Sequence, residues 1–99
     1  MENQHRKITG YRDLSQTEID LMNEIKALGI QLHDMVEKVR QHIYVQAALL
    51  DTLVNPEVAE AELYRLQEAE PHKWQMHGEL RLQEGLMMLT RAVAQPTTF

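Results

Sequence analysis

With 99 residues, 43% of them hydrophobic and 25% charged, the chain has the size and composition of one small folded domain with a modest core. A net charge of -5 argues against a protein that grips long nucleic acids, and the absence of cysteine excludes disulfides and thiolate metal sites. No apolar run approaches the roughly 18 residues of a membrane span and no signal-peptide pattern is present, so we expect an intracellular protein without a membrane partner.

The N-terminal part of the chain predicts an arm followed by a long helix. Residues 1–13 are polar and show no apolar period, which is typical of an arm. Ser15 and Glu18 then have the spacing of a capping box at a helix start. Apolar residues recur in heptad-like steps through the following segment, so we expect a first helix over residues 15–50. Gly29 inside it predicts a close approach, either by another helix or by something else at the backbone.

A middle segment and a last helix complete the expected elements. Residues 55–57 read Asn-Pro-Glu, which are an N-cap, a proline at the first helical position and an acid in the first turn. They predict a middle helical segment over residues 56–70, which Pro71 ends or kinks. The last helix is expected over residues 72–95.

These elements predict an all-α fold, with one helical-hairpin domain spanning residues 1–99. Two long antiparallel helices form the hairpin, with the arm before them and the middle segment between them. Gly78 and Gly85 lie on one face of the last helix and would let another helix come close. Two helices cannot cover all the apolar rows, so we expect a compact homo-oligomer.

The sequence carries no pattern of catalytic or metal-binding residues. His33 and Glu37 lie one helical turn apart, but a lone pair falls short of the ligands that a metal site needs. Ser15 is a candidate nucleophile that already has a role as a helix cap. Glycine-rich phosphate loops are also missing from the sequence. We expect no catalytic residue, no metal and no cofactor.

Tyr11 on the arm and Lys26 in the first helix admit two interpretations. In one, the ring of Tyr11 anchors the arm and Lys26 is an ordinary surface cation. In the other, a ring that stacks on a base and a cation that meets a phosphate form a nucleotide site. The helix rises about 16 Å from its start to Lys26. Tyr11 therefore reaches the Lys26 of its own chain only if the arm folds back, and otherwise the two meet across a subunit boundary.

The end of the last helix gathers hydrogen-bonding side chains, among them Thr90 and Arg91. A cation near a helix C-terminus is favourable without any ligand, because it faces the negative end of the helix dipole. The same residues also admit a second polar site.

Two segments resemble a known family: GYRDLSQTEIDLMNEIKALG near the start and LQEGLMMLTRAVAQP near the end. They are similar to the small phage anti-CBASS sponge proteins, which share a helical hairpin domain with the sponges that counter the Thoeris defence. The resemblance covers residues 8–40 and 74–97. It implies a protein that is not an enzyme and that sequesters cyclic oligonucleotide second messengers uncleaved, so that CBASS immune effectors are never activated. Its place of action would be the cytoplasm of the infected bacterial host.

The resemblance also implies assembly and site residues. Family members are homohexamers whose pockets for cyclic dinucleotides, such as 3′,3′-cGAMP, lie between subunits. The matching positions for the dinucleotide are Tyr11 for stacking and Lys26 for phosphate, with Gly10 and Arg12 beside Tyr11 on the arm. Candidate positions for a cyclic trinucleotide are Thr90, Arg91 and Arg81.

One departure and two alternatives remain open at this point. Where the family pattern has an arginine shortly after Trp74, this chain has Glu79, with Arg81 nearby. The first alternative function is a helical adaptor or inhibitor that acts through protein contacts. The second is a sponge for cyclic ADP-ribose signals.

Overall fold

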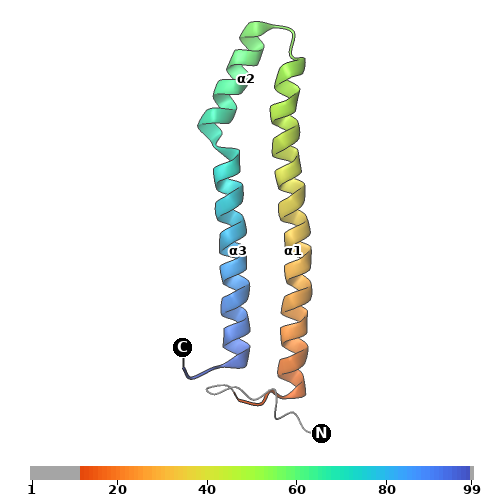
Figure 1. The fold of residues 1–99 in the computed structure, drawn as a ribbon, viewed down its shortest axis with the longest axis vertical. Coiled ribbons are helices and arrows are strands. Elements are labelled where there is room, and N and C mark those ends of the chain that lie inside the picture. The colour runs from red at the N-terminus through yellow and green to blue at the C-terminus, as the bar shows by residue number, and fades with distance from the viewer. Residues whose placement is uncertain (1–11, 99) are drawn as a thin grey trace. The chain divides into compact units, whose positions relative to one another are not determined.

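The computed structural model describes residues 12–98 and shows helices throughout (Figure 1). Helix α1 spans Gln16–Leu49, and a short 3-10 helix, η2, follows at Leu50–Thr52. Helix α2 spans Pro56–Ala69 and helix α3 spans Pro71–Ala94. No strand occurs in the described range. The predicted all-α class is therefore confirmed, with two long helical stretches of which the second is bent between α2 and α3.

The predicted helix caps are confirmed by their hydrogen bonds. The backbone N–H of Glu18 donates to Oγ of Ser15 at 3.2 Å, and the backbone N–H of Ser15 donates to Oε1 of Glu18 at 2.8 Å. This reciprocal pair is a capping box and satisfies two N–H groups at the start of α1. At the start of α2, Oδ1 of Asn55 accepts from the backbone N–H of Glu57 at 2.9 Å.

The bend between α2 and α3 lies at Glu70. This residue has a left-handed backbone conformation with φ of 49°, and its N–H donates to the carbonyl of Leu66 at 3.1 Å. Helix α3 then begins at Pro71, whose ring cannot continue the preceding helix. The proline at this position thus ends α2, as the sequence predicts.

The chain divides into two units, which we describe separately. Unit 1 comprises Met1–Gln31 and Leu82–Phe99, and unit 2 comprises Leu32–Arg81. In unit 1 the first half of α1 lies beside the second half of α3, in the opposite direction (Figure 1). Two contacts fix this antiparallel order, because Arg12 reaches Val93 while Gly29 meets Leu86.

The glycines differ in what surrounds them. A Cβ on Gly29 would lie 3.3 Å from Cδ1 of Leu86, so the predicted close approach of another helix at Gly29 is confirmed. A Cβ on Gly78 or Gly85 would meet nothing within 4 Å. The described chain therefore does not itself supply the helix expected near those two glycines.

Unit 2 contains what core the described chain has. Val36 and Ile43 on α1 are buried, at 9% and 6% exposure, together with the polar side chain of Gln75 on α3. Next to them, Nη2 of Arg40 donates to Oε1 of Glu79 at 2.8 Å, and Nε2 of Gln75 donates to the same oxygen at 3.1 Å. A satisfied polar network of this kind favours one register of the two helices over others.

Candidate functional site

An open cavity of about 670 Å³ lies in unit 1, between the first half of α1 and the second half of α3. Its volume is in the range of about 300–1,000 Å³ that is typical of small-molecule sites. The residues that line it are mainly apolar, with a few polar groups. They are Met22, Asn23, Ile25, Lys26 and Gly29 from α1, and Leu86, Met87, Thr90, Arg91, Ala94 and Pro96 from α3 and the segment after it.

The charge of this cavity is positive. Lys26 and Arg91 are the only charged residues among the described residues that line it, and both are cations. The cavity thus differs in charge from the chain as a whole, which has a net charge of -5. Two cations without a carboxylate beside them in the lining favour an anionic ligand.

The polar groups of the cavity have defined roles in the structure. Oγ1 of Thr90 donates to the carbonyl of Leu86 at 2.9 Å, which leaves the lone pairs of the hydroxyl oxygen to accept from a ligand. Nη2 of Arg91 donates to the carbonyl of Thr98 at 3.3 Å. This bond uses one of the five N–H donors of the guanidinium, so the others remain suited to a phosphate.

The structure brings together residues that the family resemblance assigns to two different sites. Lys26, predicted to bind a cyclic dinucleotide, lines the same cavity as Thr90 and Arg91, which are the candidates for a cyclic trinucleotide. Arg81, the third trinucleotide candidate, belongs to unit 2 and does not line this cavity. Asn23 is a lining residue that the sequence analysis missed. Its signal was its position three residues before Lys26, which places both on one helix face.

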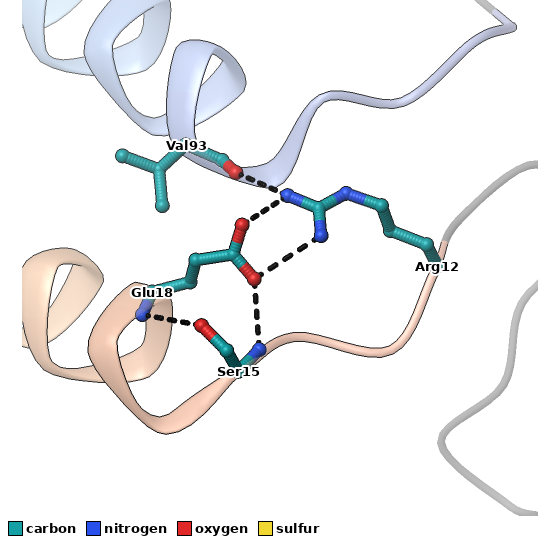
Figure 2. Close-up of polar contacts among 4 residues, drawn as sticks. All are labelled: Arg12, Ser15, Glu18 and Val93. Carbon is teal, nitrogen blue, oxygen red and sulfur yellow. Dashed lines mark hydrogen bonds and ion pairs between the residues drawn. The ribbon is translucent and has the colours of Figure 1, made fainter.

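The remaining predicted residues lie on the arm. Gly10 and Tyr11 are outside the described residues. Arg12 is described, and its guanidinium contacts two protein groups (Figure 2). Nη1 donates to Oε1 of Glu18 at 3.1 Å, while Nη2 donates to Oε2 of Glu18 and, at 2.9 Å, to the carbonyl of Val93. We call this arrangement of Arg12, Glu18 and Val93 the Arg12 clasp.

The clasp changes the acidity of Glu18. The hydrogen bond from Arg12 is the main cause that lowers the pKa of Glu18 from 4.5 to about 2, and the bond from the backbone of Ser15 adds to it. In return, the hydrogen bond to Glu18 raises the pKa of Arg12. Both effects favour the charged forms, so the ion pair is complete at neutral pH.

A second cavity, of about 700 Å³, lies in unit 2 beside η2 and α2. Arg65 is the cation that lines it, and its Nε and Nη2 donate to the two carboxylate oxygens of Glu62 at 2.7 and 2.8 Å. A cation that is already paired with a carboxylate offers little to an anion. The cavity of unit 1 is therefore the better candidate for an anionic ligand.

Residues 12–98 offer neither a cluster of metal ligands nor a membrane-spanning helix. No three histidine or acidic side chains in this range gather closely enough to hold a metal ion. None of the helices in this range is long and apolar enough to cross a membrane.

Comparison with known proteins identifies a relative over nearly the whole chain. No family model matches the sequence. The chain is 40% identical to anti-CBASS protein 2 of Pseudomonas phage JBD67, over an alignment of 105 positions that covers 97% of this chain and 97% of the relative. The similarity thus extends over both units, and over the arm that precedes Arg12.

Proposed function

The chain belongs to the family of phage anti-CBASS protein 2, and from this premise we propose that it sequesters the cyclic oligonucleotides that activate CBASS effectors. The observation that carries this proposal is the cavity of unit 1, which combines an apolar lining with two cations and no carboxylate among its described residues. A cyclic oligonucleotide has flat bases and anionic phosphates. Apolar surface suits the bases, and the cations suit the phosphates.

Each proposed contact follows from the chemistry of its side chain. Lys26 meets a phosphate of a cyclic dinucleotide as a compact charge, while Tyr11 supplies the ring that stacks on a base. Arg91 suits bidentate recognition of a phosphate. Thr90 accepts a hydrogen bond from the ligand, because its own proton is directed to Leu86. We assign Thr90 and Arg91 to a cyclic trinucleotide, as the family resemblance implies.

We propose further that the protein holds its ligand without cleaving it, in the cytoplasm of the infected host. Each site removes one molecule of the messenger from solution, so sequestration depends on tight binding and on the number of sites. Turnover of the messenger is not needed. The cavity offers cations, a hydroxyl and an amide, which are groups suited to binding.

Self-association, as a homohexamer, is the second part of the proposal. None of the described residues of unit 1 is buried in the single chain. Its exposed large apolar residues lie on both helices. They are Ile19, Leu21, Leu28 and Ile30 on α1, and Leu82, Met87, Met88 and Leu89 on α3. Contacts with other copies would remove this apolar surface from water and close the open side of the cavity.

A calorimetric titration tests the proposal directly. The purified protein is titrated with 3′,3′-cGAMP, a cyclic triadenylate and a cyclic ADP-ribose isomer, and the bound ligand is then released by heat and identified by mass. We expect saturable binding of a cyclic dinucleotide and its recovery intact. Recovery of a linear product would show an enzyme instead. Binding of the ADP-ribose isomer alone would reassign the sponge to another class of signal.

The exposed apolar residues of unit 1 also suit a helical adaptor that binds another protein. Such an adaptor would produce no heat with any of the three nucleotides. The same titration therefore separates the two functions.

A further inference from the structure

Thr90 lines the cavity of unit 1 with a hydroxyl whose hydrogen already has a partner. Oγ1 of this half-buried residue donates to the carbonyl of Leu86, four residues earlier in α3, at 2.9 Å. A hydroxyl has one hydrogen and two lone pairs. Thr90 therefore presents a ligand with an acceptor and not with a donor.

This acceptor restricts the ligand atoms that can bind to it. The phosphates of a cyclic oligonucleotide are ionised at neutral pH and carry no hydrogen, so they only accept hydrogen bonds. Two kinds of donor remain on the ligand, which are the ribose 2′-hydroxyls and the N–H groups of the bases. Thr90 thus suits a sugar or a base, whereas the two cations of the lining, Lys26 and Arg91, suit the phosphates.

The residue that follows Thr90 favours the sugar over the base. Arg91 comes directly after Thr90 and lines the same cavity, and consecutive Cα atoms lie about 3.8 Å apart. The protein therefore offers an acceptor and a cation side by side. A ribose offers the complementary pair, because its 2′-hydroxyl and its 3′-phosphate are on adjacent carbons. The N–H groups of a base are separated from the phosphate by the sugar.

We propose that Thr90 is a specificity-determining residue that accepts a hydrogen bond from a ribose 2′-hydroxyl, so that the cavity selects cyclic ribonucleotides in which this hydroxyl is free. The inference rests on the proposed function and concerns the cyclic trinucleotide, to which we assign Thr90 and Arg91. A 2′-hydroxyl lets a protein tell RNA from DNA at a given site. It is present on every ribonucleotide, so this selection does not depend on the identity of the base.

The bond from Thr90 to Leu86 also has a purely structural interpretation. Threonine hydroxyls in helices can bond to a carbonyl of the preceding turn without any ligand. Thr52 makes such a bond in unit 2, where its Oγ1 donates to the carbonyl of Leu49 at 2.7 Å. Thr52 lines the second cavity and not that of unit 1, so it is a matched control for Thr90.

A cycle that changes both partners of the proposed bond tests it. The wild type and Thr90→Val are each titrated with cyclic triadenylate and with the analogue in which fluorine replaces all three 2′-hydroxyls. Fluorine cannot donate, and valine puts a methyl group in place of the hydroxyl. We expect the wild type to bind the fluoro analogue about three- to tenfold more weakly than cyclic triadenylate, which is the effect of one neutral hydrogen bond. Thr90→Val should lose affinity for cyclic triadenylate to a similar extent and should bind the two ligands equally.

Three results of this cycle would overturn the proposal. Equal binding of the two ligands by the wild type would show that the 2′-hydroxyl is not recognised. A Thr90→Val variant with unchanged affinities would leave its hydroxyl with the structural role alone. A loss in this variant that is equal for both ligands would place Thr90 against another ligand atom, such as the amine of a base.

Two further variants control for changes in the fold. Thr52→Val removes a hydroxyl with the same kind of bond and should change neither the affinity for cyclic triadenylate nor the preference for it over the fluoro analogue. A changed preference in this variant would place the ligand in the second cavity and contradict the proposal. Thr90→Ser keeps the hydroxyl and should restore most of the preference that valine removes, and failure to restore it would count against a hydrogen bond. The comparison of the two ligands on the wild type needs no variant.

The titrations separate failure of the inference from failure of the proposed function. If the wild type binds none of the cyclic nucleotides, the function is wrong and the role of Thr90 falls with it. If the wild type binds 3′,3′-cGAMP or cyclic triadenylate but does not distinguish the fluoro analogue, the sequestering function stands and only the role of Thr90 is wrong.

Discussion

Gly29 on α1 and Leu86 on α3 form the closest described approach of a glycine to the opposite helix, where a Cβ on Gly29 would lie 3.3 Å from Cδ1 of Leu86. Both residues line the cavity of unit 1. The atom that a new methyl group would meet is the end of a flexible side chain, beside open space. A side chain at position 29 can therefore be accommodated, but only by moving Leu86.

Gly29→Ala should raise stability slightly and weaken ligand binding. Alanine gains up to about 1 kcal/mol over glycine inside a helix, part of which is lost in displacing Leu86 by a few tenths of an ångström. The displaced side chain changes the lining of the cavity. Urea unfolding and titration with 3′,3′-cGAMP measure the two effects.

Gly85→Ala is the matched control, because a Cβ there meets nothing within 4 Å and Gly85 does not line the cavity. It should gain stability without losing affinity, and a net loss of stability in Gly85→Ala would mean that a second copy fills this space.

Lys26 and Arg91 should contribute to different ligands although they line one cavity. Loss of a bond between a cation and a phosphate costs about 10- to 100-fold in affinity, so Lys26→Ala should weaken 3′,3′-cGAMP to this extent. The bond from Arg91 to the carbonyl of Thr98 holds its guanidinium toward the segment after α3, and we expect Arg91→Ala to weaken the cyclic trinucleotide more than the dinucleotide. Lys38→Ala changes an exposed lysine of α1 in unit 2 and should change neither affinity. Equal losses of both ligands in both variants would show a single shared site.

The stability contributed by the Arg12 clasp should depend on pH in the acidic range. The folded state lowers the pKa of Glu18 from 4.5 to about 2. A carboxyl whose pKa is lower in the folded state stabilises fully above its unfolded pKa, and this contribution disappears as the pH falls through the folded pKa. The difference in melting temperature between the wild type and Glu18→Gln should therefore be constant from pH 7 to about 5 and shrink between about 4.5 and 2. A difference that persists below pH 2 would contradict the ion pair as its source.

Local signals predicted much of this structure, because each depends on a few neighbouring residues. The capping box of Ser15 and Glu18 marks the start of α1, and Pro71 marks the end of α2. Two other contacts are not local. The clasp joins Arg12 to Val93, which lie 81 positions apart in the sequence, and the ion pair of Arg40 with a glutamate on α3 joins residues 39 positions apart.

Such long-range pairs depend on the register of two helices, and apolar periodicity does not determine register. The same reason explains the candidate site. The sequence named Lys26, Thr90 and Arg91 as separate candidates, but only the packing of α1 beside α3 places them around one cavity.

Removing self-association should remove ligand binding even when every proposed contact residue is present. Ile30 on α1 and Met88 on α3 are 63% and 68% exposed in the single chain, and neither lines the cavity. A carboxylate buried at a subunit contact without a partner is costly, so the double variant Ile30→Glu and Met88→Glu should sediment as a smaller species and bind 3′,3′-cGAMP at least tenfold more weakly.

Gln31→Glu with Gln83→Glu adds the same charge at exposed polar positions of the same helices and should preserve both properties. A wild-type protein whose sedimentation gives the mass of one chain, 11.6 kDa, would refute a site completed by assembly. A monomeric variant with full affinity would refute it as well.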